Sequence, residues 1–477
     1  MTELITFLEN HWEKVTKLEV REHEENENIR ERNPLKRDYA RVIYSTSFRR
    51  QQGKMQLFEV NSKAFHRNRL THSFEVAQIA RGIVDELEKT VKEEEKYKQK
   101  NDEDKSKIEL NFSKMNIVVE TGSLIHDIGN PPFGHHGERI LNKLASDIGF
   151  EGNAQGIRVL RKIEKKSPQY NGLNLTYRTL AAIIKYFVPY GKDKKKFLYK
   201  DDYNDLSKKI KNVLDKDSLP FRTIDVQIVD LADEIAYCAH DLEDALASNY
   251  FTIDEFIFRL ENIEDNDLDV KSKEAFKTWV KNAKYFAEKD KKKDLQEINT
   301  KIQIEDYDFY FRRELISTIV NQLIEDIGVV QVDSKFKNQT GTINEEELGF
   351  LKYTKLAEAL KKTIFNCVTS SDNIMLYEKV GTKVLTRLFE LFMNEEYNKD
   401  GMLMPVEYRW DNNTRKKEKT RKVLDYISGM MDTYAIEVYI KHFGEDPFNV
   451  KYDREIFKDS KQKHSSIFSG LKDSFFS

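Results

Sequence analysis

The stretch from Val119 to Asn142 constrains this chain more than any other, and it reads VETGSLIHDIGNPPFGHHGERILN. Its apolar start predicts a short helix from Ser123 to Ile128, which presents the adjacent pair His126 and Asp127. Glycine permits unusual φ angles and proline fixes φ, so four residues predict a tight, rigid loop after this pair: Gly129, Pro131, Pro132 and Gly134. A second predicted helix opens with His135, His136 and Glu138.

Histidines and carboxylates flank this loop within thirteen residues, from His126 to Glu138. Imidazole and carboxylate groups serve both as metal ligands and as acid–base groups, so the arrangement indicates a metal site with catalytic side chains beside it. An adjacent His-Asp pair alone is common in structural settings, and the surrounding glycines and prolines are what favour the functional interpretation. For His136, a structural role or a place beside the site is the preferred interpretation.

A third element carries further acids. Residues 224–248 predict a helix of about 25 residues that contains no glycine or proline. Asp233, Tyr237 and Asp241 are spaced four apart and therefore share one face of this helix. The alternative interpretation is a partly buried helix face with solvated acids.

A metal site can be assembled from three separate helices. His72 begins one of them, His126 and Asp127 end another, and Asp233 lies on the third. Two imidazoles and two carboxylates suit one divalent ion such as Mn²⁺, Fe²⁺, Co²⁺ or Zn²⁺. Asp230, one turn before Asp233, competes with it for the ligand role.

Composition excludes several classes of protein. With 79 basic and 82 acidic residues the net charge is −3, which argues against a dedicated nucleic-acid coat. The two cysteines, Cys238 and Cys367, are too few for a disulfide framework. The start of the chain lacks a signal-peptide pattern, and no apolar run approaches about 18 residues, so we expect a soluble cytoplasmic protein without membrane contact.

The predicted fold is all-α, because apolar residues recur with helical periodicity along most of the chain and strand-like alternation is scarce. Three highly charged stretches, at residues 86–107, 191–217 and 263–300, are predicted to lie at the surface.

Five segments together resemble one known family. RLTHS, HDIGNPPFGHHGE, GNAQGIR and DEIAYCAHDLEDA follow one another in the order found in the deoxyguanosine triphosphate triphosphohydrolases of the HD superfamily. The late segment VLDYISGMMDTYAIEVY resembles the C-terminal signature of that family, so the resemblance covers residues 37–250 and 420–440. The long HDIGNPPFGH run is specific, whereas a bare HD pair would not be.

The resemblance implies an HD-domain helical fold in three segments. Residues 1–36 would form an N-terminal helix and connection, and residues 37–260 the phosphohydrolase core. Residues 261–477 would form a helical region that completes the substrate pocket and makes oligomer contacts. One divalent metal ion is implied, with Mn²⁺ or Mg²⁺ as first choice and Fe²⁺, Co²⁺ or Zn²⁺ as alternatives. Its implied ligands are His72, His126, Asp127 and Asp233.

The resemblance also implies roles in catalysis and phosphate binding. His135 and Glu138 would be the catalytic pair, with the carboxylate orienting the imidazole. Arg69 would meet the α-phosphate, since a guanidinium fork suits phosphate oxygens. Lys185 and Tyr186 resemble a phosphate-contacting pair. Whether His135 acts as general acid or activates the nucleophile stays open.

The sugar end of the substrate is implied as well. Tyr237 would pack on the deoxyribose and leave no space for a 2′-hydroxyl, while Asp241 would accept a hydrogen bond from the 3′-hydroxyl. Gln56 is a candidate for a sugar or base contact. Asn130 and Asn153 stand where related enzymes can carry histidines that face the phosphates, so the roles of these two substrate-site candidates stay open.

The implied activity is metal-dependent hydrolysis of deoxynucleoside triphosphates, dGTP favoured, to deoxynucleoside and inorganic tripolyphosphate. The alternatives are another HD-family nucleotide phosphohydrolase, such as a nucleotidase or cyclic-nucleotide phosphodiesterase, and a non-catalytic regulatory protein that binds nucleotides or single-stranded DNA. The resemblance further implies a homo-oligomer, with a hexamer among the expected states, and a single-stranded DNA or nucleotide effector.

Overall fold

Helices dominate the computed structural model, which describes residues 3–25, 33–57, 67–191, 195–214, 222–290, 300–369 and 372–449. The predicted all-α class is confirmed. The α-helices are α1 (Leu4–Lys17), α2 (Pro34–Tyr44), α3 (Thr46–Arg50), α4 (Arg69–Glu93), α5 (Glu95–Lys98), α6 (Asp102–Ile125), α7 (Gly134–Leu144), α8 (Gly152–Arg158), α9 (Tyr177–Ala181), α10 (Lys200–Val213), α11 (Ile224–Ala247), α12 (Ile253–Glu261), α13 (Val270–Asp290), α14 (Thr300–Glu325), α15 (Ser334–Thr340), α16 (Thr354–Val368), α17 (Asp372–Met393), α18 (Lys416–Ser428) and α19 (Asp432–Phe443). Short 3-10 or π segments are η2 (Gln51–Gly53), η3 (Val159–Ile163), η4 (Lys399–Gly401) and η5 (Val406–Tyr408).

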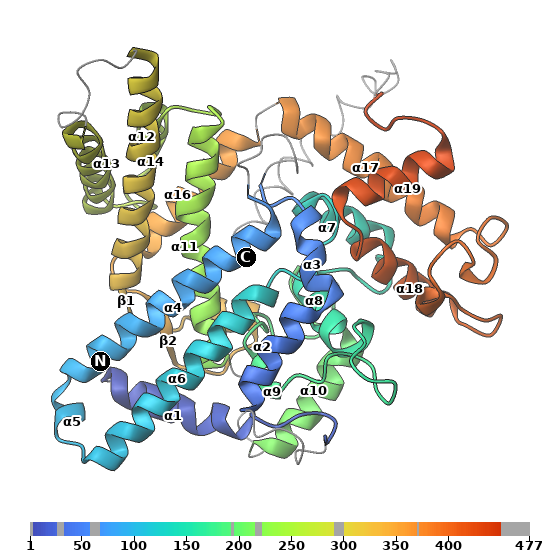
Figure 1. The fold of residues 1–477 in the computed structure, drawn as a ribbon, viewed down its shortest axis with the longest axis horizontal. Helices are drawn as coiled ribbons and strands as arrows, with labels where there is room; N and C mark the ends of the chain where they lie inside the picture. The colour runs from blue at the N-terminus through green and yellow to red at the C-terminus, as the bar shows by residue number, and fades with distance from the viewer. Residues whose placement is uncertain are drawn as a thin grey trace.

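The main core is built around α11, which packs against α4, α6, α14 and α16 (Figure 1). Most residues of this helix are buried, so it lies in the middle of the bundle and most of its acids face particular partners rather than bulk water. Side chains of α1 complete the same core, with Trp12 packed edge-on against Phe112 of α6.

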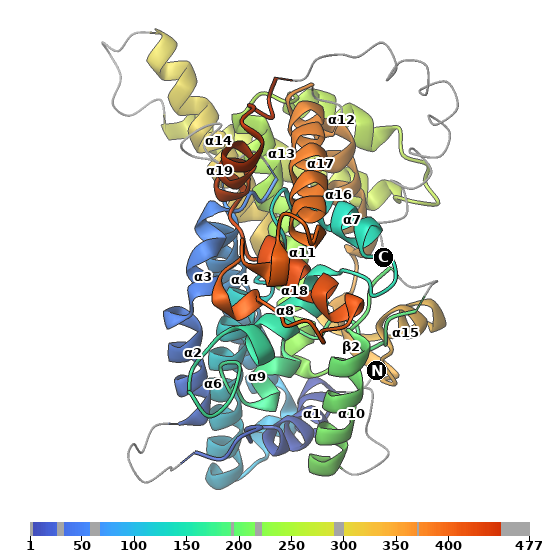
Figure 2. The ribbon, with the colours of Figure 1, turned by 90° about the vertical axis from the view of Figure 1, so that its right-hand side faces the viewer.

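A second core joins α7 to the C-terminal helices. Phe133 and Leu141 pack there with Leu385 and Leu388 of α17 and Tyr439 of α19. Figure 2 shows α7 beside α17, although their sequences are more than two hundred residues apart. The C-terminal region therefore supports the helix that carries His135.

Of the predicted short helix over residues 123–128, residues 123–125 form the last turn of a longer helix and residues 126–128 follow it as a turn. α6 has 24 residues and begins after the N-cap Asn101, whose side chain accepts the N–H of Asp104. Ile108 and Phe112 continue its buried face upstream, beyond the short apolar run on which the prediction rests. The helix ends at Ile125, so the His-Asp pair lies just beyond it.

The loop after α6 is as tight as its glycines and prolines predict. A Cβ on Gly129 would lie 2.1 Å from the backbone nitrogen of Gly156, so only glycine fits this close approach to α8. Phe133 (φ 62°) and Gly134 (φ 56°) are both left-handed and turn the chain into α7.

Where the structure describes them, the charged stretches are less exposed than predicted, because each carries apolar side chains that reach a core. Residues 192–194, 215–217 and 291–299 of these stretches lie outside the described residues. The chain turns back through α5 between α4 and α6 instead of extending one helix into solvent. The buried apolar residues of these stretches include Val91 and Tyr97 in the first, Phe197, Tyr199 and Leu206 in the second, and Phe276 and Trp279 in the third.

A small hairpin was not predicted. β1 (Ile327–Gln331) and β2 (Glu346–Phe350) pair antiparallel, with α15 in their connection. Among the described helices, none has the length and apolar character that crossing a bilayer requires. The predicted segment boundaries at residues 36 and 260 stay a prediction.

Candidate active site

Three helices bring two histidines and an aspartate together beneath the wall of a large cavity. His72 lies in the first turn of α4, where the side chains of Asn68 and Thr71 form a reciprocal capping box that fixes this turn. His126 follows the last residue of α6, and Asp233 lies in the middle of α11. The cap of α4 and the end of α6 therefore fix the backbone positions from which the two imidazoles project.

The three side chains converge on one point. His72 Nε2 lies 3.1 Å from Asp233 Oδ1, and His126 Nε2 lies 3.4 Å from the same oxygen. All three side chains are buried, and one ligand atom from each lies within 4.8 Å of the others. Two imidazoles and a carboxylate at this spacing could hold a metal ion.

The hydrogen bonding of His126 tests whether a cation fits. Its Nδ1 lies 2.6 Å from the backbone oxygen of Ser123, so Nδ1–H donates there, and in the neutral, metal-binding form of the ring Nε2 carries the lone pair. That Nε2 is buried and has no hydrogen-bond partner among the described residues, yet it faces carboxylate oxygens of Asp233 and, at 3.7 Å, Asp127. A lone pair facing carboxylates is repulsive, and a divalent cation between them removes the repulsion.

Asp127 lies beside this cluster but is held by other groups. Its carboxylate accepts hydrogen bonds from the guanidinium of Arg69 and from the side-chain amide of Asn130. Although burial opposes its charge, the guanidinium of Arg69 holds the pKa of Asp127 below its usual range. The carboxylate is thus ionised, as a ligand must be, and its orientation is fixed by Arg69.

Asp233 and Asp230 of α11, the two candidates for the ligand role, differ in the side chains that they contact. Asp233 faces the histidines, whereas Asp230 lies 3.0 Å from Lys185 Nζ and 2.8 Å from Arg222 Nη2 and is 32% exposed. Lys185 also reaches Asp233 Oδ2 at 2.7 Å. Geometry therefore favours Asp233 as the ligand and makes Asp230 a support for Lys185.

A cavity of about 1570 Å³ opens over the cluster. Among the predicted residues, those that line it are Gln56, His126, Asp127, Asn130, His135, Glu138, Asn153, Lys185, Tyr186, Asp233, Tyr237 and Asp241. Arg69 and His72 are buried behind this wall. The phosphate contact predicted for Arg69 stays a prediction, since its guanidinium is engaged by Asp127.

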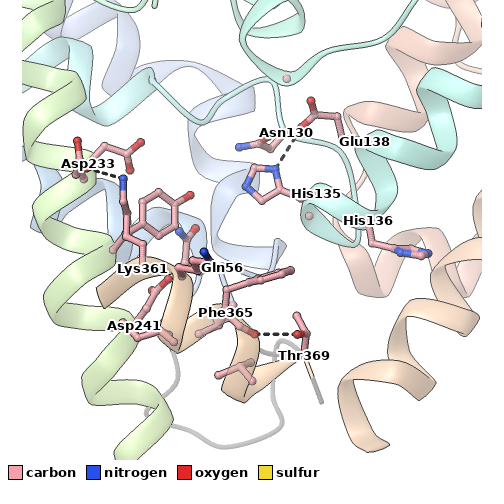
Figure 3. A pocket seen from close by; sticks show the side chains of 18 of the residues that line it. Gln56, Asn130, His135, His136, Glu138, Asp233, Asp241, Lys361, Phe365 and Thr369 are labelled. Atoms are coloured by element: carbon pink, nitrogen blue, oxygen red, sulfur yellow. Dashed lines mark hydrogen bonds and ion pairs between the residues drawn. The ribbon is translucent and has the colours of Figure 1, made fainter. Parts of the chain in front are cut away.

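The predicted catalytic pair faces the cavity from α7. His135 Nδ1 lies 3.3 Å from Glu138 Oε2, one turn further along the helix (Figure 3). The side chain of His135 is partly exposed, while that of Glu138 is mostly buried. With Nδ1 directed at the carboxylate, the Nε2 atom lies on the side of the His135 ring away from Glu138.

His136 points away from this pair, toward α17 (Figure 3). Its Nε2 lies 2.7 Å from Thr382 Oγ1, and its Nδ1 lies 3.4 Å from Glu378 Oε1. These contacts agree with the interpretation of His136 as a structural neighbour of the site.

Two polar acceptors line the opposite part of the cavity. Gln56 Oε1 and Asp241 Oδ1 are buried and have no hydrogen-bond partner among the described residues. Burial raises the pKa of Asp241 well above its usual value. Tyr237 lies between Asp233 and Asp241 on the same helix face, with its ring centroid 5.7 Å from that of His72.

The remaining polar candidates are tied to acids at the cavity edge. Asn130 donates to Asp127, and Asn153 donates to Glu151 at 2.7 Å. Tyr186 lines the cavity next to Lys185, and burial raises its pKa. Both asparagines therefore orient carboxylates in this structure, and their substrate roles stay predictions.

Sequence reasoning missed several cavity residues. Lys196 follows a run of lysines that was read as a surface excursion, and Phe336 lies in the unpredicted hairpin connection. Lys361 and Phe365 lie four apart on α16, so a shared helix face was the available signal, but nothing local directed that face to this cavity.

Two known domain families match parts of this chain. The HD domain matches residues 69–238, a range that contains His72, His126, Asp127 and Asp233. The phosphohydrolase-associated domain matches residues 352–441. A Vibrio cholerae serotype O1 protein named deoxyguanosinetriphosphate triphosphohydrolase-like protein 2 is 43% identical over 452 residues, which cover 93% of this chain and 97% of that protein. The chain belongs to the deoxyguanosinetriphosphate triphosphohydrolase-like family of the HD superfamily.

Other members of this family resemble the chain along most of its length. A deoxyguanosinetriphosphate triphosphohydrolase-like protein of Shewanella sediminis is 30% identical, over 86% of this chain and 91% of its own. One from Shewanella baltica is 28% identical, over 89% of this chain and 95% of its own. The phosphohydrolase-associated domain covers α16, α17, α18 and most of α19.

Proposed function

We propose that this protein hydrolyses deoxynucleoside triphosphates, dGTP favoured, to a deoxynucleoside and inorganic tripolyphosphate. The observation that carries the proposal is the His72, His126 and Asp233 cluster at the wall of a cavity that also contains the His135–Glu138 pair. A site for a cation and a site for proton transfer thus open into one space. The names of the relatives support the same class of substrate.

The metal ion would be held by His72, His126, Asp127 and Asp233, with Mn²⁺ or Mg²⁺ proposed. When bound, it polarises phosphate oxygens and lowers the pKa of a bound water. In the proposed reaction a water oxygen bonds to the α-phosphorus and the bond from that phosphorus to the 5′-oxygen breaks. One proton of the water is lost and the 5′-oxygen takes up a proton, which balances the products.

Side chains around the cavity would transfer the proton and bind the sugar and the phosphates. His135 would exchange the proton at its Nε2, because its Nδ1 faces Glu138. Tyr237 and Asp241 would hold the sugar, with Gln56 beside them, and Lys185 with Tyr186 would hold phosphates. Asp230 and Asp233 raise the pKa of Lys185 against the effect of burial, so this ammonium stays charged toward an anionic substrate.

Product analysis tests the proposal. The purified protein is incubated with each of the four dNTPs and with GTP in Mn²⁺ or Mg²⁺, and products are separated by ion-exchange chromatography. Deoxynucleoside together with intact tripolyphosphate is the expected result. Release of phosphate or pyrophosphate would indicate another HD-family phosphohydrolase, and binding without turnover would indicate a regulatory nucleotide- or DNA-binding protein.

Assembly and regulation also belong to the proposal. A homo-oligomer, with a hexamer as the state to test, is expected from the resemblance, and single-stranded DNA or a nucleotide is the expected effector. Light scattering after gel filtration measures the oligomeric state. Turnover with and without an oligonucleotide or a second dNTP measures the effect of the effector.

A further inference from the structure

Lys196 is a cavity-lining residue that the proposed function leaves without a role. Its backbone is anchored by the next residues: the ring of Phe197 packs against Tyr190 at 4.7 Å between centroids, and Leu198 N donates to Val188 O at 2.7 Å. The side chain is directed inward, with 18% of its surface exposed. The fold therefore fixes the position of the Lys196 side chain.

The ammonium of Lys196 joins two acids from different elements. Its Nζ lies 3.0 Å from Glu151 Oε1 and 3.3 Å from Glu138 Oε1. The other oxygen of Glu138 lies 3.3 Å from His135 Nδ1. A continuous chain of polar contacts therefore runs from Glu151 through Lys196 and Glu138 to His135.

Glu151 is a fixed anchor for this chain. It is the N-cap of α8, where its Oε2 accepts the N–H of Ala154 at 2.8 Å. Its Oε1 accepts the side-chain amide of Asn153 at 2.7 Å. The carboxylate is fully buried and held by two donors, so it can in turn hold Lys196 in place.

Electrostatics make Lys196 the main counter-charge of Glu138. Burial opposes ionisation of Glu138, yet Lys196, and after it His135, hold the pKa of this carboxyl well below its usual range. Burial and the neighbouring Glu138 raise the pKa of Glu151, although Lys196 opposes that shift. Without Lys196, two buried carboxylates would face each other, and one of them would take up a proton.

We propose that Lys196 is a positioning residue, which keeps Glu138 ionised and directed at His135 Nδ1 so that the imidazole presents Nε2 to the substrate. The inference rests on the proposed function, because it assigns Lys196 to the catalytic pair of that reaction. It predicts that Lys196 acts on turnover only through Glu138. A lysine that instead bound substrate phosphates would act independently of Glu138.

A double-mutant cycle separates these roles. Lys196→Met, Glu138→Gln and the double variant are compared in dGTP turnover at saturating metal. We expect Lys196→Met to lower kcat by about tenfold or more with KM within about threefold of the unaltered enzyme. In the Glu138→Gln background the same change should alter kcat by less than about twofold, because residues that act as one unit are not additive.

The pH profile gives a second readout. The charged and titratable groups that face Glu138 and Lys196 are His135, Glu151 and Tyr186. Loss of the ammonium raises the pKa of Glu138, so the acidic limb of the kcat/KM profile should move to higher pH in Lys196→Met. Lys196→Arg should restore most of the profile.

Lys200→Met is the matched control, since it removes an exposed lysine four residues further along and should change neither kcat nor the profile. If Lys196→Met does not fold, Lys196→Gln gives the same comparison, because its amide keeps hydrogen bonds without the charge. A raised KM with an undiminished effect in the Glu138→Gln background would overturn the inference and leave the proposed function standing. Absence of turnover by the unaltered protein on all four dNTPs would instead overturn the proposed function, and the inference with it.

Discussion

Asp432 Oδ1, at the start of α19, accepts the backbone N–H of Phe133 at 3.1 Å, although the two residues are 299 positions apart in the chain. The other carboxylate oxygen accepts the N–H of Met55 at 2.9 Å. Phe133 leads directly into the helix that carries His135, and Met55 precedes Gln56. One buried carboxylate of the C-terminal region thus ties together both sides of the cavity.

Asp432→Ala should therefore weaken both stability and turnover. The change leaves the buried N–H of Phe133 and the partly buried N–H of Met55 unpaired, at a cost of about 2–4 kcal/mol in the free energy of unfolding, and it loosens the turn before His135. Urea unfolding and dGTP turnover measure the two effects. Glu437→Ala removes an exposed acid from the same helix and is the control. Equal unfolding midpoints for these two variants would contradict the structural role of Asp432.

The metal assignment predicts a contrast between two aspartates of one helix. Asp233→Asn should reduce metal affinity by more than the roughly 10–100-fold that loss of a supporting group costs, because Asp233 faces both histidines. Asp230→Asn should retain metal, since its partners are Lys185 and Arg222. The metal content of each variant, measured after dialysis, distinguishes the two aspartates. Full occupancy in Asp233→Asn with loss in Asp230→Asn would reverse the assignment.

Substitution of the catalytic pair should lower turnover without removing metal or dGTP binding. His135→Ala should keep its metal and bind dGTP but lose turnover by roughly 10² or more, the scale of a general acid or base. Glu138→Gln should lose less, because the amide can still orient the imidazole. His136→Ala is the control, as its ring contacts Thr382 and Glu378. Single-turnover rates that fall further in His136→Ala than in His135→Ala would exchange the two roles.

Sugar selection should depend on Tyr237. The unaltered protein should hydrolyse dGTP far better than GTP, and Tyr237→Ala should raise the relative rate on GTP by about tenfold or more, because the space for a 2′-hydroxyl opens. Since this ring also lies beside His72, metal content must be measured in the same samples. Equal rates of the unaltered protein on GTP and dGTP would remove Tyr237 from this role.

Stability should depend on pH through Lys54, whose ammonium is buried and donates to the backbone oxygens of Asn130 and Ser428. Burial lowers the pKa of Lys54 to about 7. Between this value and the higher pKa of the unfolded chain, the unfolded state binds more protons, so stability rises with pH from about 7 to about 10.

The Lys54→Met variant isolates this effect. The unfolding free energy of the unaltered protein minus that of Lys54→Met should increase as pH rises through this window, with a slope of at most about 1.4 kcal/mol per pH unit. Below about pH 7 the difference should level off. Denaturant titrations at four pH values measure it, and a pH-independent difference would show that Lys54 keeps its proton in the folded state.

Much of the fold follows from local sequence. The caps of α4 and α6 and the glycines and prolines of the loop act within a few residues of themselves, so the adjacent His126 and Asp127, and His135 with Glu138 one turn apart, could be placed without any tertiary contact. The all-α class follows in the same way, since helical periodicity is a property of each segment. The start of α6 does not follow from local sequence, because burial of Ile108 and Phe112 depends on partners far along the chain.

Only the tertiary structure decided which side chains meet. Asp230 and Asp233 have similar local sequence, and the packing of α11 against α4 and α6 turns Asp233, rather than Asp230, toward the histidines. The placement of Lys196 beside Glu138, and of Asp432 beside Phe133, likewise depends on contacts between elements. The sequence by itself determined the chemical groups and their local spacing, whereas their convergence required the rotation of each helix, which is set by burial of its apolar face against distant partners.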